Sequence, residues 1–79
     1  MLKIIADYEP SEKILQEMVG GNTEIITLKN GDILVINREG KRLNLNYNSE
    51  ATKIYQENGG MRSMDIVGMA VLVKKGLMI

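Results

Sequence analysis

The sequence predicts one α+β domain over residues 1–79, with a mostly antiparallel sheet and two helices on one of its faces. Three observations lead to this class. Segments rich in β-branched residues alternate with amphipathic ones, glycine-containing turns separate them, and a composition of 44 % hydrophobic and 25 % charged residues is that of a globular protein. The predicted order is β-α-β-β-(β)-α-β, the order of a ferredoxin-like split βαβ with one short additional strand.

The first strand and the first helix follow from local patterns. Residues 2–8 alternate with the period of a strand. A helix is predicted over residues 11–19, because Pro10 suits a helix start and apolar residues recur on one stripe. Gly20 and Gly21 supply the left-handed stop.

A hairpin is predicted next, from strands at residues 24–28 and 33–37. Asn30-Gly31 between them is typical of a two-residue loop in which both positions have positive φ. That loop would place Leu28 opposite Ile33.

Apolar residues stand on both faces of this hairpin, and the second face needs cover from a loop or a second subunit. A flexible methionine loop between the second helix and the last strand suits an adaptable interface as well. The predicted interface residues are therefore Ile25, Leu34, Ile36, Met61 and Met64.

The second half continues with a turn in which Gly40 is expected at positive φ, and then the short strand, residues 41–47. Leu43, Leu45 and Tyr47 are expected to point inward there, with asparagines outward. A helix follows over residues 49–57.

Asn48 or Ser49 is the expected N-cap of this second helix, and Gly59 its stop. Residues 65–74 are apolar on both faces, which predicts a central strand, and Gly68 within it indicates a bulge or a close backbone approach.

Charge and composition exclude several classes of function. Ten basic and ten acidic residues cancel, whereas a duplex nucleic-acid binder is usually basic, so duplex nucleic acid is a disfavoured partner. Residues 1–40 hold four basic and seven acidic residues, a net charge of −3, and residues 41–79 hold six and three, a net charge of +3. This asymmetry is either chance in a short chain or a basic patch for an anionic ligand.

The chain lacks the usual catalytic groups, because it contains neither histidine nor cysteine and its carboxylates are scattered singly. We therefore predict no enzyme, no catalytic residue, no metal site and no cofactor. The longest apolar run, residues 66–73, is too short to cross a bilayer, and the first residues do not resemble a signal peptide. These features predict a cytoplasmic protein without a membrane partner.

Two groups of residues are candidates for ligand binding. Asn44 and Asn46 present amide donors and acceptors beside Lys41 and Arg42. These four residues form either a recognition strip for polar ligands or a polar edge that discourages aggregation. Arg62, on a glycine-flanked loop, could bind a phosphate or a carboxylate.

Several short signatures together resemble a family of small proteins from phages, prophages and other mobile elements, known as a domain of unknown function. The similarity extends from about residue 2 to residue 76. Two positions depart from that family's pattern, which commonly has an aromatic residue near Asn22 and a small hydroxyl residue in place of Met69. The residues that carry the resemblance are Val19-Gly20-Gly21 with Glu24, Asn37-Arg38-Glu39-Gly40-Lys41, Asn48, and Asp65-Ile66-Val67-Gly68.

The resemblance implies a setting, an infected bacterial cytoplasm, but no activity. The leading hypothesis is a non-enzymatic accessory protein for host takeover or counter-defence, which sequesters an immune factor or its small anionic nucleotide signal. A protein–protein inhibitor of a host enzyme and a structural homo-oligomeric assembly module are the alternatives. A homo-oligomer is expected in each case, since so short a chain buries little apolar surface alone.

Overall fold

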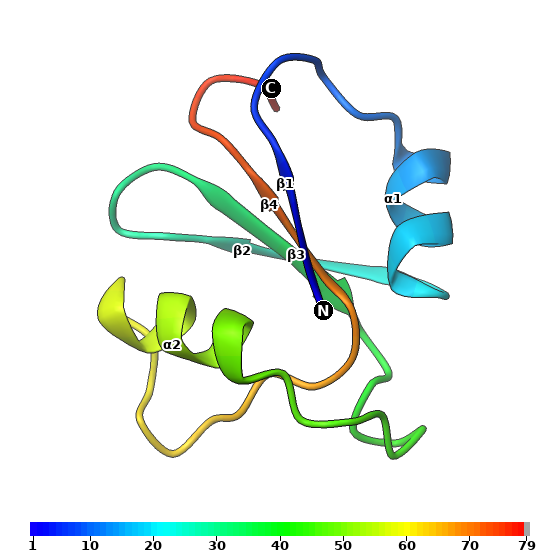
Figure 1. Cartoon of the computed structure of the whole chain (residues 1–79), viewed down its shortest axis with the longest axis vertical. Helices are drawn as coiled ribbons and strands as arrows, with labels where there is room; N and C mark the ends of the chain where they lie inside the picture. Colours follow the sequence, from blue (N-terminus) through cyan, green and yellow to red (C-terminus); the bar gives the residue numbers. More distant parts are fainter. Residues whose placement is uncertain (79) are drawn as a thin grey trace.

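The computed structural model describes residues 1–78 and confirms the α+β class. Its elements follow the order strand, helix, two strands, helix, strand (Figure 1). They are β1 (Leu2–Ile5), α1 (Glu12–Val19), β2 (Thr23–Thr27), β3 (Ile33–Asn37), α2 (Ser49–Glu57) and β4 (Ala70–Val73).

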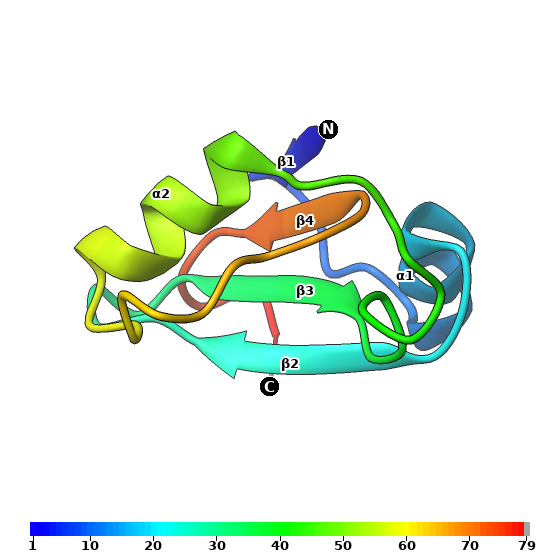
Figure 2. The same ribbon diagram turned by 90° about the horizontal axis from the view of Figure 1, so that it is seen from below.

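The four strands form one mixed sheet in the spatial order β1-β4-β3-β2. β1 is parallel to β4, and the two other pairs are antiparallel. Helix α1 connects β1 to β2. These two strands lie at opposite edges of the sheet, with β4 and β3 between them (Figure 2). In a split βαβ unit only one strand lies between the two strands that the helix connects. The prediction of a ferredoxin-like strand order is therefore wrong.

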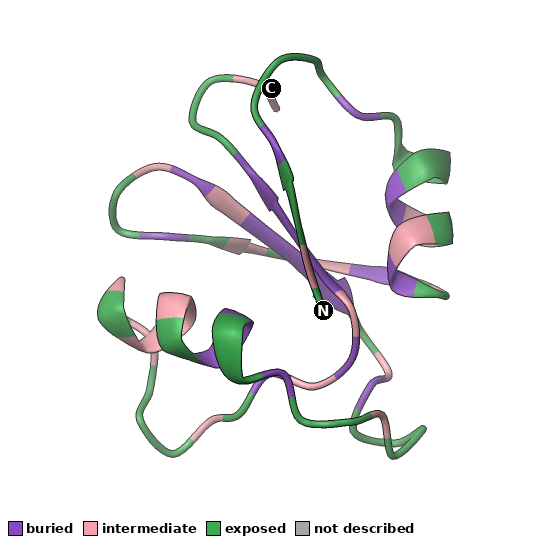
Figure 3. Ribbon diagram, in the orientation of Figure 1, coloured by how far each residue is buried: buried purple, intermediate pink, exposed green. Residues whose placement is uncertain are grey.

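The two helices cover opposite faces of the sheet, which corrects the prediction that they share one face (Figure 1). Leu15 and Val19 of α1 pack in one cluster with Val35 of β3, whereas Ala51 of α2 packs in the other with Leu34. The physical reason is the period of the strands. β3 and β4 are buried on both faces, so each face requires its own cover (Figure 3).

This arrangement changes the meaning of two predicted interface residues. Leu34 and Ile36 are 0 % and 6 % exposed, and both lie in the cluster beneath α2. The chain itself thus supplies the cover that we expected from a loop or a second subunit.

The helix ends agree with the predicted signals. The Ser11 hydroxyl accepts a hydrogen bond of 3.2 Å from the Ile14 amide, and Gly20 ends α1 at φ +81°. At α2 the N-cap is Asn48, not Ser49, and its side-chain oxygen accepts from the Ala51 amide at 3.0 Å.

The hairpin between β2 and β3 has a different loop and a register shifted by one residue. The Gly31 amide donates to the Leu28 carbonyl, and the Leu28 amide donates to the Asp32 carbonyl, both at 2.9 Å. Only Gly31 has positive φ, so the connection is a three-residue loop with a glycine bulge. Consequently Thr27, and not Leu28, stands opposite Ile33.

Asn30 explains why the two-residue turn does not form. Its side-chain oxygen accepts from the Asp32 amide at 2.9 Å, a local bond that holds Asn30 outside the left-handed region.

Residues 41–47 do not form the predicted additional strand. The Leu43 amide donates to the Glu39 carbonyl and the Leu45 amide to the Gly40 carbonyl, so the chain coils here instead of extending. Tyr47 makes a single bridge to Val67. Leu43 and Tyr47 are exposed, contrary to the inward orientation that alternation predicted.

The positive φ of this turn belongs to Asn44, at +56°, and not to Gly40. Gly40 is needed for space, because a Cβ there would lie 2.9 Å from the Val67 side chain. β4 is also shorter than predicted and begins at Ala70. Gly68, which precedes it, has φ +81° and approaches Leu45 closely, as the sequence indicated.

Candidate functional site

A cleft of about 120 Å³ opens where β2, the end of β3, the turn after β3 and the segment before β4 meet. Two acidic and two basic residues line it, together with apolar ones. The lining residues are Glu24, Ile36, Asn37, Arg38, Gly40, Lys41, Met64, Asp65 and Val67.

Asn37, the last residue of β3, holds the base of the cleft in place. Its side-chain nitrogen donates to the Val19 carbonyl at 3.2 Å, and its side-chain oxygen accepts from the Glu39 amide at 2.8 Å. The first bond fixes β3 to the end of α1, and the second fixes the turn that carries Arg38. Because the Asn37 side chain is buried and satisfied, the position of this turn is well determined.

The opposite wall comes from the segment before β4. The absence of a side chain at Gly40 lets the turn approach Val67, and the bridge between Val67 and Tyr47 fixes this segment from its other side. Met64 is held by a contact of 3.4 Å between its sulfur and the Tyr55 hydroxyl. The cleft is thus bounded by backbone and side chains with defined partners.

The structure brings only one of the predicted ligand-binding residues into the cleft. Lys41 lines it. Arg42 forms an ion pair of 2.9 Å with Glu39 on the exposed side of the turn, and Asn44 and Asn46 lie on the surface of the same turn, outside the cleft lining. Because the segment is coiled, the asparagines do not form the continuous row that a strand would give them.

Arg62 lies apart from these residues, in the loop after α2. Its side chain is exposed, and its carbonyl accepts a hydrogen bond of 3.0 Å from the Gln56 side chain. Of the remaining predicted interface residues, Met64 lines the cleft, while Ile25 and Met61 are exposed.

Three charged residues of the cleft were not predicted as site residues, although each belongs to a segment that carries the family resemblance: Glu24, Arg38 and Asp65. Glu24 stands opposite Ile36 in the observed register, so a correct hairpin register would have placed it beside the cleft wall. The motifs that contain Arg38 and Asp65 predicted a turn and a bulge, and only the tertiary structure brings residues 38 and 65 to the same cleft.

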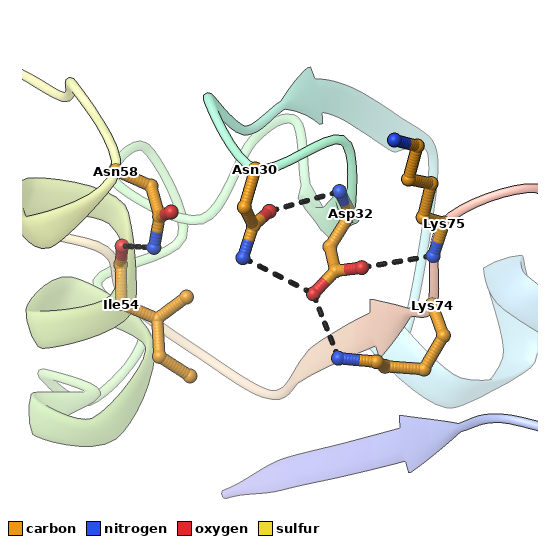
Figure 4. Close-up of polar contacts among 6 residues, drawn as sticks. All are labelled: Asn30, Asp32, Ile54, Asn58, Lys74 and Lys75. Atoms are coloured by element: carbon orange, nitrogen blue, oxygen red, sulfur yellow. Dashed lines mark hydrogen bonds and ion pairs between the residues drawn. The ribbon is translucent and has the colours of Figure 1, made fainter.

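A second polar cluster surrounds the buried carboxylate of Asp32 (Figure 4). Its two oxygens accept from the Lys74 ammonium at 3.0 Å and from the Lys75 amide at 2.8 Å, and the Asn30 side chain donates at 3.3 Å. Burial by itself raises the pKa of the Asp32 carboxyl, but the hydrogen bonds and the positive charge of Lys74 outweigh it, so the pKa lies below 3.8.

This cluster links the hairpin loop to the end of β4. All oxygens of the carboxylate are occupied by the protein's own donors, so its role is structural, and it offers no free group to a ligand.

Within residues 1–78, no set of three acidic, histidine or cysteine side chains could hold a metal ion. None of the helices in the same range is long and apolar enough to cross a membrane.

The fold and the cleft define a small α+β protein with a mixed sheet between two helices. The chain belongs to DUF3846, a domain of unknown function, whose family model matches residues 3–76. The similarity to a family of unknown function is therefore confirmed. No curated protein and no solved structure matches the chain.

Proposed function

We propose that the protein is a non-catalytic binding protein, and that the cleft beside β2 holds part of an anionic small nucleotide. The observation that carries the proposal is the arrangement of charges. Arg38 and Lys41 line the cleft and would bind phosphates, and Glu24 and Asp65 offer acceptors for hydroxyl or amino groups. A nucleotide presents both kinds of group.

The apolar wall supports the same class of ligand. Ile36, Met64 and Val67 offer a surface for a base or a sugar ring. The cleft volume of about 120 Å³ is smaller than that of a site which encloses a whole ligand, about 300 Å³ or more. The remainder of the nucleotide would therefore lie on the exposed turn, residues 38–46.

The biological setting of the proposal is host takeover or counter-defence. The resemblance to proteins of phages and mobile elements supports a place in the cytoplasm of an infected bacterium, where sequestering a nucleotide signal would blunt an immune response. The lack of histidine and cysteine supports an action by binding and not by turnover.

Calorimetry against a panel of cyclic and ADP-ribose-type nucleotides tests the ligand directly. We expect heat with at least one member, and a loss of about tenfold or more in affinity for Lys41→Glu, because one phosphate contact becomes repulsive. Lys53→Glu is the matched control, since Lys53 is equally exposed but lies on α2, outside the cleft. Absence of heat with every nucleotide would contradict the proposal.

A second candidate, a protein–protein inhibitor of a host enzyme, is favoured by one observation. Leu43 and Tyr47 are large side chains exposed in the segment after β3, and tyrosine is a residue type that interfaces enrich. A pull-down from host lysate with the wild type and with Leu43→Ser distinguishes it. A specific host protein lost with Leu43→Ser supports the inhibitor, and an equal recovery with both contradicts it.

A further inference from the structure

We propose that two copies of the chain pair edge to edge through β2, antiparallel, to form one continuous eight-stranded sheet. In the spatial order β1-β4-β3-β2, β2 is the outermost strand, and within residues 1–78 no other strand pairs with its outer side. This edge adjoins the cleft, because Glu24 belongs to both, but the pairing does not depend on the identity of any ligand.

The hydrogen bonds of the hairpin show which backbone groups of β2 face outward. The Leu28 amide donates to Asp32, and the Arg38 amide donates to the Asn22 carbonyl. In an antiparallel ladder, bonded residues alternate, so Glu24 and Ile26 also direct their backbone groups toward β3. The N–H and C=O groups of Thr23, Ile25 and Thr27 consequently point away from β3, toward the outer edge, where Ile25 and Thr27 are exposed and Thr23 is 8 % exposed.

The sequence of β2 is complementary to itself in the register that these groups dictate. A two-fold axis at Ile25 places Ile25 opposite its own copy and Thr23 opposite Thr27. All the outward-directed backbone groups then find partners, about six hydrogen bonds in total. Glu24 stands opposite Ile26, so the one charge of the strand does not directly face its own copy.

The exposed side chain of Ile25 adds an apolar contact at the axis. It is 44 % exposed in the single chain, and in the pair it would stand beside the second Ile25. β2 also lacks proline, lysine and a bulge within residues 23–27, the devices that protect edge strands from pairing. The other edge strand, β1, is shorter and carries Lys3, so β2 is the edge better suited to a second copy.

Disulfide trapping tests the register, because the chain has no natural cysteine. Directly opposed residues of an antiparallel pair have Cα atoms about 5.5 Å apart, which a disulfide can span. We expect Ile25→Cys to oxidise rapidly to a covalent dimer of twice the 8.8 kDa chain mass. Ile4→Cys is the matched control, since Ile4 is 57 % exposed on the opposite edge strand and should remain monomeric under the same conditions.

Sedimentation equilibrium tests the dimer without any covalent bond. We expect the wild type to associate, Ile25→Lys to raise the dissociation constant at least about tenfold by placing two ammonium groups together, and Ile4→Lys to behave as the wild type. Circular dichroism establishes that each variant is folded. A wild type that stays at 8.8 kDa up to about 0.5 mM, or an Ile25→Lys variant that dimerises as the wild type does, would overturn the proposal.

Both experiments are performed without nucleotide, so their outcome is separate from that of the calorimetry. A monomer that still gives heat with a nucleotide would refute the β2 pairing alone.

Discussion

Replacement of Asn48 by alanine should destabilise the protein more than any other single polar truncation that we consider. Its side chain is 1 % exposed and joins three segments of the backbone. The side-chain oxygen accepts from the Ala51 amide at the start of α2, and the side-chain nitrogen donates at 2.8 Å to both the Met1 and the Gly68 carbonyls.

The magnitude follows from these three bonds. Loss of the N-cap costs about 1 kcal/mol. The Gly68 carbonyl would be left buried without this partner, at about 1.5 kcal/mol. The Met1 carbonyl would lose one of two donors, because it still accepts from the Ala70 amide at 3.0 Å, so its loss should cost only about 0.5 kcal/mol. The total is about 3 kcal/mol, which is a large part of the free energy of unfolding of so small a domain.

Urea unfolding followed by circular dichroism measures this loss, and two further variants separate its parts. Serine and aspartate cap helices about equally well. The serine hydroxyl has one donor where the asparagine amide has two, and an ionised carboxylate has none and would face two carbonyl oxygens. We expect the order of stability to be wild type, Asn48→Ser, then Asn48→Asp at neutral pH. A loss below about 1 kcal/mol for Asn48→Ala, or Asn48→Asp as stable as the wild type, would refute the reasoning.

Three further predictions concern other buried or constrained positions. The pKa of the Asp32 carboxyl is lower in the folded protein than in the unfolded chain, so its ionised form contributes stability at neutral pH that is lost as the pH falls through the folded-state pKa. Urea midpoints of the wild type and Asp32→Asn should therefore converge in acid, and a constant difference would contradict this. Gly60→Ala should cost at least about 2 kcal/mol in thermal unfolding, since its Cβ would lie 2.5 Å from the Tyr55 carbonyl oxygen. Gly76→Ala meets no atom within 4 Å, and its cost should be only about 1 kcal/mol, that of an alanine at φ +87°. Equal losses would argue against the steric cause at Gly60. Ser11→Ala should lower the free energy of unfolding by about 1 kcal/mol and Ser11→Asp should preserve it, as urea titration would show; equal losses in both would exclude capping.

The local parts of the fold could be predicted because their causes are local. Ser11 and Gly20 bound α1, and Asn48 begins α2, each through contacts within a few residues of the chain. Hydrophobic periodicity likewise located the four strands, with β1 and β4 shorter than expected.

The register of the hairpin and the sides taken by the helices could not be predicted in this way. The loop depends on a competition between positive φ at Asn30 and the bond from its side chain to Asp32, which the Asn-Gly pair alone does not reveal. When strands are apolar on both faces, their periodicity does not indicate which face each helix covers. That depends on the chain connections.

The candidate cleft was predicted least well, because tertiary structure assembles it. Lys41 was identified from its sequence neighbours, but Glu24, Arg38 and Asp65 come from three separate segments. The predicted asparagine row depended on a strand at residues 41–47, and it was lost when that segment coiled.

The position of β1 has a consequence for how the chain is made. Leu2 pairs with Ala70, so about 68 further residues must be synthesised before β4, the one partner of β1 among the described strands, leaves the ribosome. At about 5–20 residues per second this delay is about 3–14 s. β2, β3, α2 and β4 are neighbours along the chain, and we expect them to close first, with β1 joining afterwards as the last and least protected strand in hydrogen exchange.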